Sequence, residues 1–393
     1  MIGGFAGYET EINYRPLLLD GITLANTTIL DGAGQVSHVV TGAEGAVLDG
    51  FTITGGAAIG EGNDARGGGI YNDNCSMRIL NCTFTENEAS YGGAIYNGEG
   101  TGTSIAGGLV IDGCTFTGNH ASLDGGAVFN ADNTAVSITS SVFDANGADW
   151  TGGALCSLSA VTVNDCNFNG NSAESGGAVY DYNEASVFTG CSFDGNSAET
   201  GGAVYNTGPI TITANTENDI SCTFSSNRAD YGGAVYNDSS GITGGIYDEV
   251  VFNDVDFASN TASVSGGAVY NKRCTPVFNA CSFSSTVADT SANAVTAGGA
   301  AYNEWCYASF DDCSFTYLTA PSGGAIYADR GSLECDGCDF SACGRAASGS
   351  TSVYGGAAYV TGGIAAIFTG SSFSYGRARD GAGIYFNGGA SAD

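Results

Sequence analysis

Basic residues are scarce in this chain of 393 residues. Lys272 is the only lysine, and lysine and arginine together number 10 against 41 aspartates and glutamates, for a formal net charge of −31. A surface of this charge repels nucleic acid and anionic membranes, because both are negatively charged. We therefore expect no nucleic-acid partner.

Long apolar runs are also missing. No stretch approaches the roughly 18 apolar residues of a membrane-spanning helix, so we expect no membrane insertion by this segment. The opening "MIGGFAGYET" has neither the basic nor the apolar region of a secretion signal, and any such signal is expected to lie outside this sequence. Proline is rare, with 4 residues.

Glycine is abundant, with 63 residues, but it does not recur at every third position, which excludes collagen. Hydrophobic residues make up 43% of the chain, more than a disordered segment carries. Many short apolar strands joined by glycine-containing turns fit this composition.

One phrase recurs along almost the whole chain, for example "CNFNGNSAESGGAVYD" (166–181) and "CSFDGNSAETGGAVYN" (191–206). Its phenylalanines are separated by 25 to 33 residues, which is typical of coils with a constant core and variable loops. They are Phe84, Phe116, Phe143, Phe168, Phe193, Phe224, Phe257, Phe283, Phe315, Phe340 and Phe373. Glycine in every unit argues against helical repeats.

Within one repeat, apolar residues alternate with polar ones. In "VTVNDCNFNGN" the pairs Val161/Val163 and Cys166/Phe168 each lie on one face of a strand, with a bend between them. The segment "GGAVYD" adds a third short strand. The pattern predicts an all-β parallel β-helix, one solenoid domain of about 12–13 coils with about three strands each. Residues 1–56 form its N-terminal coils and 57–393 its continuous repeat part.

The repeats resemble a known family. Paired F-x-x-N and G-G-A-[ILV] motifs, as in "FTENEASYGGAIYN" (84–97) and "FSSNRADYGGAVYN" (224–237), are similar to those of the polymorphic outer-membrane proteins. The resemblance implies a right-handed parallel β-helix carried as the surface passenger of an autotransporter. The head of the chain is similar to bacterial surface proteins with right-handed β-helix repeats. Four late repeats depart from F-x-x-N, with Thr286, Leu318, Cys343 and Gly376 in place of Asn.

The asparagine of each F-x-x-N motif is predicted to belong to a structural ladder. At a bend, its amide would hydrogen-bond from coil to coil, which satisfies a buried polar group. A ligand role is the weaker interpretation, because the turn preference of Asn already explains the position. The ladder comprises Asn87, Asn119, Asn146, Asn171, Asn196, Asn227 and Asn260.

A second aromatic column follows the glycines. A second inward column would overpack a narrow core, so we expect the preceding Val or Ile to face inward and the Tyr outward. Outward tyrosines stabilise the sheet, and they form an alternative platform for a glycan or a cell-surface protein. The surface-binding candidates are Tyr180, Tyr205, Tyr236, Tyr270 and Tyr302.

The 14 cysteines fall mostly on the inward face, two residues before the column phenylalanines, and we interpret them as buried inert thiols. Among the others, Cys274 and Cys306 stand out as a pair. Each lies nine residues before its phenylalanine, so the two would stack in consecutive coils at a distance that a disulfide accepts. A disulfide between them is a hypothesis.

Four acidic residues share one turn position in successive repeats: Asp149, Glu174, Glu199 and Asp230. Exposed carboxylates tolerate this stacking in water, so a solvated acidic row is the first interpretation. A weak Ca²⁺ site is the alternative, because Ca²⁺ selects oxygen ligands. No other cofactor is expected.

Signals of catalysis are poor. A glycosidase needs two carboxylates in a groove, and a lyase acting on uronates needs basic residues, which are few here. The longest insertions, 285–299 and 341–356, contain no constellation of acids and bases. We expect no enzyme, and keep a polysaccharide lyase or glycoside hydrolase as an alternative.

The sequence therefore predicts an extracellular or cell-surface structural rod that serves as an adhesin passenger, a spacer or a filament subunit. A glycan-binding module is the alternative of another class. Terminal coils without caps would pair with another chain. We expect either a longer native chain or end-to-end homo-assembly, and a glycan or host-cell protein as a further partner.

Overall fold

The structure is a computed structural model that describes residues 1, 27–73, 75–98, 108–182, 185–241, 248–288, 297–344, 354–363, 365–388 and 391–392. By its internal contacts the chain divides into two compact units, Met1–Ser172 and Ala173–Asp393. The expected organisation, with N-terminal coils over 1–56 and a continuous repeat part over 57–393, stays a prediction, and residues 2–26 of that N-terminal part lie outside the described residues.

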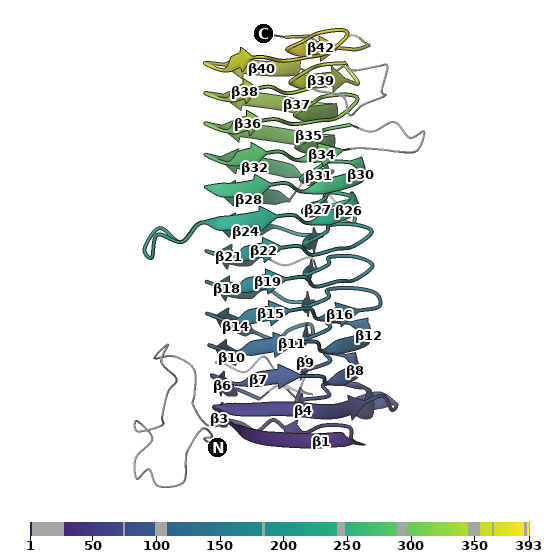
Figure 1. The fold of residues 1–393 in the computed structure, drawn as a ribbon, viewed down its shortest axis with the longest axis vertical. Helices are drawn as coiled ribbons and strands as arrows, with labels where there is room; N and C mark the ends of the chain where they lie inside the picture. The colour runs from purple at the N-terminus through teal and green to yellow at the C-terminus, as the bar shows by residue number, and fades with distance from the viewer. Residues whose placement is uncertain are drawn as a thin grey trace. The chain divides into compact units, whose positions relative to one another are not determined.

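The first unit is a stack of parallel β-strands in successive coils (Figure 1). One stack contains β2 (Val40–Thr41), β5 (Ile70–Asp73), β9 (Ile95–Gly98), β13 (Val128–Asn130) and β17 (Leu155–Ser157). The next contains β3 (Val47–Asp49), β6 (Arg78–Leu80), β10 (Leu109–Asp112), β14 (Val136–Thr139) and β18 (Val161–Asn164).

A third stack of this unit contains β1 (Thr28–Val36), β4 (Phe51–Ala58), β7 (Thr83–Thr85), β11 (Thr115–Thr117), β15 (Val142–Asp144) and β19 (Asn167–Asn169). The short strands β8 (Glu88–Tyr91), β12 (His120–Asp124) and β16 (Gly147–Ala148) pair in succession, and β8 pairs with the last two residues of β4. A short 3-10 helix, η2 (Gly62–Ala65), follows β4.

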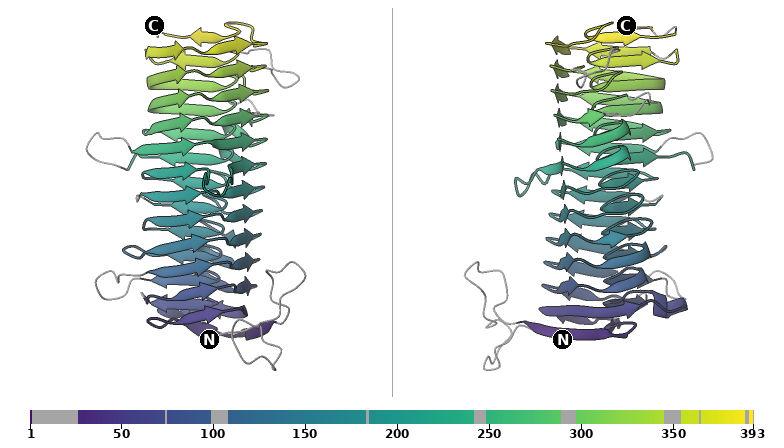
Figure 2. Two further views of the ribbon diagram at one scale, coloured as in Figure 1. Left: turned by 90° about the vertical axis from the view of Figure 1, so that its left-hand side faces the viewer. Right: turned by 45° about the vertical axis from the view of Figure 1, so that its right-hand side comes forward.

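The second unit repeats this plan (Figure 2). Its first stack contains β20 (Val179–Asp181), β23 (Val204–Asn206), β27 (Val235–Asp238), β31 (Val269–Lys272), β35 (Ala301–Asp311), β37 (Ile326–Asp336), β39 (Ala358–Thr361) and β42 (Ile384–Phe386). The next contains β21 (Ser186–Thr189), β24 (Ile210–Thr213), β28 (Glu249–Asn253), β32 (Thr275–Asn279), the second halves of β35 and β37, β40 (Ala365–Thr369) and β43 (Ser391–Ala392).

The third stack of the second unit contains β22 (Ser192–Asp194), β25 (Cys222–Ser225), β29 (Val255–Ala258), β33 (Ser282–Ser284), β36 (Ser314–Thr316), β38 (Asp339–Ser341) and β41 (Ser372–Ser374). The short strands β26 (Arg228–Tyr231), β30 (Thr261–Ser265) and β34 (Val287–Ala288) form a separate three-stranded sheet. The predicted all-β parallel β-helix is thus confirmed in each unit.

Single residues in the left-handed backbone region make the corners between strands. Asn81 and Asp165, at φ of 52° and 53°, turn the chain between the second and third stacks, a conformation that Asn and Asp accept better than most residues. At the G-G-A corner, space decides. A Cβ on Gly126 would lie 2.1 Å from the carbonyl oxygen of Gly153 in the next coil, so only glycine fits.

The phenylalanine column forms the core of both units. In the first unit, consecutive rings from Phe84 to Phe168 stack with centroids 4.7–4.8 Å apart. In the second, the rings from Phe193 to Phe373 stack at 4.5–5.1 Å. All are 0–1% exposed except Phe373, at 40%. This spacing is the strand-to-strand distance of a sheet, so the backbone sets the stacking.

Candidate functional site

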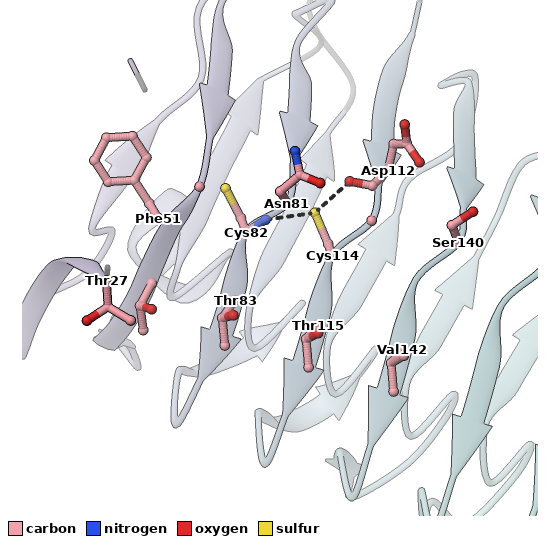
Figure 3. A pocket seen from close by; sticks show the side chains of 13 residues that line it. Thr27, Phe51, Asn81, Cys82, Thr83, Asp112, Cys114, Thr115, Ser140 and Val142 are labelled. Carbon is pink, nitrogen blue, oxygen red and sulfur yellow. Dashed lines mark hydrogen bonds between the residues drawn. The ribbon is translucent and has the colours of Figure 1, made fainter. Parts of the chain in front are cut away.

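A pocket of about 510 Å³ opens on the first unit, across the corner between its second and third stacks (Figure 3). We call it the polar pocket after the hydroxyl, amide and carboxylate side chains in its lining. Figure 3 shows Thr83, Thr115 and Val142 in one row, from β7, β11 and β15. The complete lining is Thr27, Gly50, Phe51, Thr52, Asn81, Cys82, Thr83, Asp112, Gly113, Cys114, Thr115, Ser140 and Val142.

Corner geometry positions the polar groups of this pocket. Asn81 donates from Nδ2 to Oδ1 of Asp49 at 3.0 Å, which links two consecutive corners. The thiol of Cys82 donates to the carbonyl oxygen of Leu80 at 3.2 Å and is 1% exposed. Burial raises the pKa of this thiol to about 11, and burial likewise raises that of Cys114. Neither thiol is therefore activated as a nucleophile at neutral pH.

The chemistry available in this pocket is hydrogen bonding. Asp112 is the one carboxylate among the lining residues, and none of them is basic. Hydrolysis of a glycoside needs a second carboxylate roughly 5–9.5 Å away, and this lining does not supply one. The sequence patterns did not single out this pocket, because it arises from corner residues of separate coils.

The asparagines of the F-x-x-N motifs form a hydrogen-bonded ladder in each unit. In the first unit, Asn87 donates from both its backbone N and Nδ2 to Oδ1 of Asn119, at 3.2 and 3.0 Å. Asn119 repeats this with Asn146, and Asn146 with Asn171. In the second unit, Asn196, Asn227 and Asn260 do the same. Each of these asparagines is 0–1% exposed.

A second ladder follows the aromatic column, and sequence reasoning missed it. Asn237 donates from Nδ2 to Oδ1 of Asn271 at 2.8 Å, and Asn271 to Asn303 at 2.8 Å. In the first unit, Asn72, Asn97 and Asn130 pair in the same way. The signal was present, since an asparagine follows the aromatic residue in "IYN", "VFN" and "VYN".

From Tyr180 to Tyr302, the tyrosines of the column are half-buried or, in the case of Tyr270, buried, while Val204, Val235 and Val269, each preceding a column tyrosine, are 0% exposed. Rings from Tyr180 through Tyr205, Tyr236, Tyr270 and Tyr302 stack at 4.7–5.1 Å. From Tyr205 to Tyr302 each ring has a neighbouring ring on both faces, so a sugar would reach only the edges of these rings. Tyr270 is buried, and its hydroxyl donates to Oε2 of Glu304 at 2.9 Å.

Burial also raises the pKa of the column phenols. The pKa of Tyr205 rises to about 12, mainly because burial penalises the phenolate and further because Asp238 is nearby. Tyr236, Tyr270 and Tyr302 have raised pKa values with the same leading cause. These phenols stay protonated over the physiological range, and binding of a glycan or protein by the column stays a prediction.

Cys274 and Cys306 lie in consecutive coils of the second unit, with their Sγ atoms 3.8 Å apart. Both are thiols in this structure, and both are at most 1% exposed. Burial raises the pKa of Cys274 well above its usual value. The disulfide stays a hypothesis: the two residues are neighbours, but no bond joins them.

The acidic turn residues are all exposed. In the second unit, Glu174, Glu199 and Asp230 stack through backbone hydrogen bonds of 2.9 Å. In the first unit, Asp149 lies 3.2 Å from Nε2 of His120. The described residues contain no group of three or more His, Cys, Asp or Glu side chains that could hold a metal ion. Ca²⁺ binding at these four residues stays a prediction.

Aromatic residues are exposed at places that the repeat analysis did not single out. Both tryptophans of the chain, Trp150 and Trp305, lie on the surface, as do Tyr307, Tyr317 and Tyr375. Most of the two long insertions, 289–296 and 345–353, lies outside the described residues. No helix in the described part of the chain has the length and apolar character needed to cross a membrane.

Comparison with protein families identifies the class. The family described as the right handed beta helix region matches residues 20–217, half of the chain, and the chain belongs to this family. The repeat of the Chlamydia polymorphic membrane proteins matches residues 221–238 and 254–272. The resemblance noted in the sequence is thereby confirmed. Comparisons with curated proteins and with solved structures found no match.

The two family matches lie in different parts of the chain. The matched polymorphic membrane protein repeats contain Asn227, Asn260 and the two G-G-A-V corners that follow them. Together with the β-helix, these repeats indicate a β-helical protein associated with the cell surface or the outer membrane.

Proposed function

We propose that this chain is a non-catalytic structural β-helix of the cell surface, which acts as a spacer or adhesin passenger. The observation that carries the proposal is the continuity of the side-chain ladders. In each unit, stacked phenylalanines and hydrogen-bonded asparagines recur coil after coil. An active site in such a fold needs a local break with paired acid and base groups, and the polar pocket offers one carboxylate.

The proposal that the chain is non-catalytic is tested by incubating the full chain with neutral and acidic polysaccharides and measuring new reducing ends and unsaturated products. We expect no product above the buffer control. Turnover that is lost in an Asp112→Asn variant would overturn the proposal and assign catalysis to the polar pocket.

Surface adhesion is tested with beads coated with the full chain and applied to cultured epithelial cells. Beads coated with an unrelated acidic β-protein are the control. Specific attachment would identify an adhesin passenger. Attachment no better than the control would favour a spacer.

Homo-assembly is a second candidate function. The apolar side chains of the coil that contains β41 and β42 are partly exposed, and either a second copy of the chain or a further coil of a longer native chain would cover them. Electron microscopy, with and without Ca²⁺, tests this: filaments would support assembly, and dispersed particles would contradict it.

A further inference from the structure

In the second unit, the connection between a strand of the first stack and the next strand of the second stack changes in length from coil to coil. Between β27 and β28 the chain inserts residues 239–248, but β31 and β32 are separated by only two residues. In the next two coils the insertion is absent, and β35 and β37 each run for 11 residues through the corner. No connecting loop therefore lies between the two halves of these strands, and the corner side chains reach the surface.

Three long side chains follow one another along this corner: Arg273, Trp305 and Arg330. All three have left-handed backbones, with φ of 53°, 58° and 62°. The cation of Arg330 lies 4.6 Å from the centroid of the Trp305 ring. We call these three residues, with Tyr307, the aromatic-basic corner.

Trp305 is an unusual residue for this position. Left-handed corners elsewhere in the second unit mostly use Gly, Asp, Ser or Ala, because bulky residues are strained there. Its ring is 41% exposed, and Tyr307 is 50% exposed two residues further along β35. Tyr317 and Tyr375 are also exposed aromatics at left-handed corners, but of these three only Trp305 has an arginine at the same corner of both adjacent coils, and this combination points to a binding role.

This corner is less acidic than the chain as a whole. Lys272, Arg273 and Arg330 are three of only 10 basic residues in the chain, and the three acids in neighbouring coils, Asp238, Glu304 and Asp329, balance them in number. Asp238 lies 3.2 Å from Nζ of Lys272, and Glu304 accepts a hydrogen bond from the hydroxyl of Tyr270.

The two arginines differ in their ion pairing. Asp329 lies 3.9 Å from Nε of Arg330, whose side chain is still about half exposed. Within the described part of the chain, no carboxylate lies within ion-pair distance of Arg273. The corner therefore has guanidinium groups that can take an anionic ligand.

We propose that the aromatic-basic corner binds an acidic sugar, a pyranose that carries a carboxylate. The apolar face of a pyranose packs against an exposed aromatic side chain, while a guanidinium takes a carboxylate through two parallel hydrogen bonds. The net charge of −31 repels extended polyanions, which favours a short or terminal acidic sugar. The site does not depend on whether the chain acts as a spacer.

The test uses the two tryptophans. A Trp150→Phe variant of the full chain leaves Trp305 as the one tryptophan, and its emission reports on the corner. The probes are a sialic-acid-terminated trisaccharide, a galacturonic acid oligomer, a neutral glucose oligomer of equal length and a pentaglutamate peptide. We expect an emission change with an acidic sugar, weakened by added salt, and none with the neutral oligomer.

Variants in the same background separate the corner from the rest of the surface, with binding measured by calorimetry. Arg330→Gln and Trp305→Ala should each weaken binding by about tenfold or more. Tyr317→Ser, at an exposed aromatic on another corner of the same unit, should leave binding unchanged. An unchanged circular dichroism spectrum verifies that each variant is folded.

Three results would overturn the proposal. No change in tryptophan emission with either acidic sugar would show that the corner does not bind this class of ligand. Equal binding of the neutral oligomer would show that charge is not recognised. Equal binding of pentaglutamate would assign the corner to acidic peptides instead. The polysaccharide-product assay and the search for a spacer role do not depend on this site, so a corner that fails to bind leaves the proposed function standing, and a catalytic chain would overturn the proposed function without removing the site.

Discussion

The phenylalanine and tyrosine columns of the second unit stack almost identically but differ in what surrounds them. Ring centroids are 4.5–5.1 Å apart in the first column and 4.7–5.1 Å from Tyr180 to Tyr302 in the second. Phe257 is 0% exposed, whereas Tyr236 is only half-buried. The repeat of the coils sets the stacking in both columns, so stacking alone does not reveal how much a column contributes to stability. The burial of its side chains reveals that contribution.

The largest expected effect compares the two columns directly. Phe257→Ala removes a ring from the closed core and should lower the free energy of unfolding by about 3–5 kcal/mol. Tyr236→Ala should lower it by about 1–2 kcal/mol, because its ring is partly solvated before the change. Urea unfolding followed by circular dichroism measures both. Equal losses would show that stacking, and not burial, dominates.

The next effect compares the two asparagine ladders. Asn227 accepts from the backbone N and Nδ2 of Asn196, and it donates from Nδ2 to Phe193 and to Asn260. Asn227→Ala leaves several of these buried groups without partners and should cost about 3 kcal/mol.

In its ladder, Asn237 accepts one hydrogen bond from Asn206 and donates one to Asn271. Asn237→Ala should therefore lower the free energy of unfolding by about 1.5 kcal/mol. The same urea titration measures both variants. A larger loss for Asn237→Ala would reverse the ranking of the ladders.

Raising the pH should weaken the tyrosine column while the phenylalanine column stays unaffected. The pKa of Tyr205 is about 12 in the fold, against about 10 in an unfolded chain. The stability that comes from this protonated phenol is complete below pH of about 10 and is lost as the pH rises towards about 12.

The urea midpoint should therefore fall steadily above pH of about 10, together with phenolate absorbance. A Tyr205→Phe variant should show a smaller fall. An identical fall in that variant would mean that other groups, such as the buried thiols, cause it.

The smallest effect concerns the acidic surface, where serine hydroxyl groups, in place of the scarce cations, donate hydrogen bonds to exposed carboxylates. Ser372 donates from Oγ to Oδ1 of Asp339 at 2.6 Å, and Ser282 donates to Asp256 in the same cross-strand arrangement. Because these bonds are solvated, Ser282→Ala should change stability by less than about 0.5 kcal/mol. Thermal unfolding in low and high salt measures this. A loss above about 1 kcal/mol would give these pairs a structural role.

Much of the fold follows from sequence periodicity, because every coil repeats the same contacts. The column phenylalanines, the first asparagine ladder and the inward valines all recur with the repeat. The proximity of Cys274 and Cys306 followed from their equal offsets from Phe283 and Phe315.

The candidate binding features do not repeat, and periodicity therefore could not reveal them. The aromatic-basic corner forms where the connection between the first and second stacks shortens to two residues and then disappears in β35 and β37. Arg273, Trp305 and Arg330 thereby become neighbours. The polar pocket combines corner residues such as Asn81 and Asp112, which look like ordinary turn residues in the sequence. The extent to which neighbouring rings cover the tyrosine faces depends on three-dimensional stacking.

The second asparagine ladder has open ends, and these bear on how such a chain changes length. Among the described residues, Nδ2 of Asn303 has no hydrogen-bond partner, because Ala328 occupies the ladder position in the next coil. In the ladder of the first unit, Oδ1 of Asn72 faces Gly42. Within a run of consecutive asparagines, such as Asn237, Asn271 and Asn303, each amide matches any other, so duplicating one of these coils leaves the ladder donors and acceptors paired. Gene duplication or deletion could thus alter the number of coils in whole steps, and a coil inserted after Asn303 would complete a bond that is now unmade.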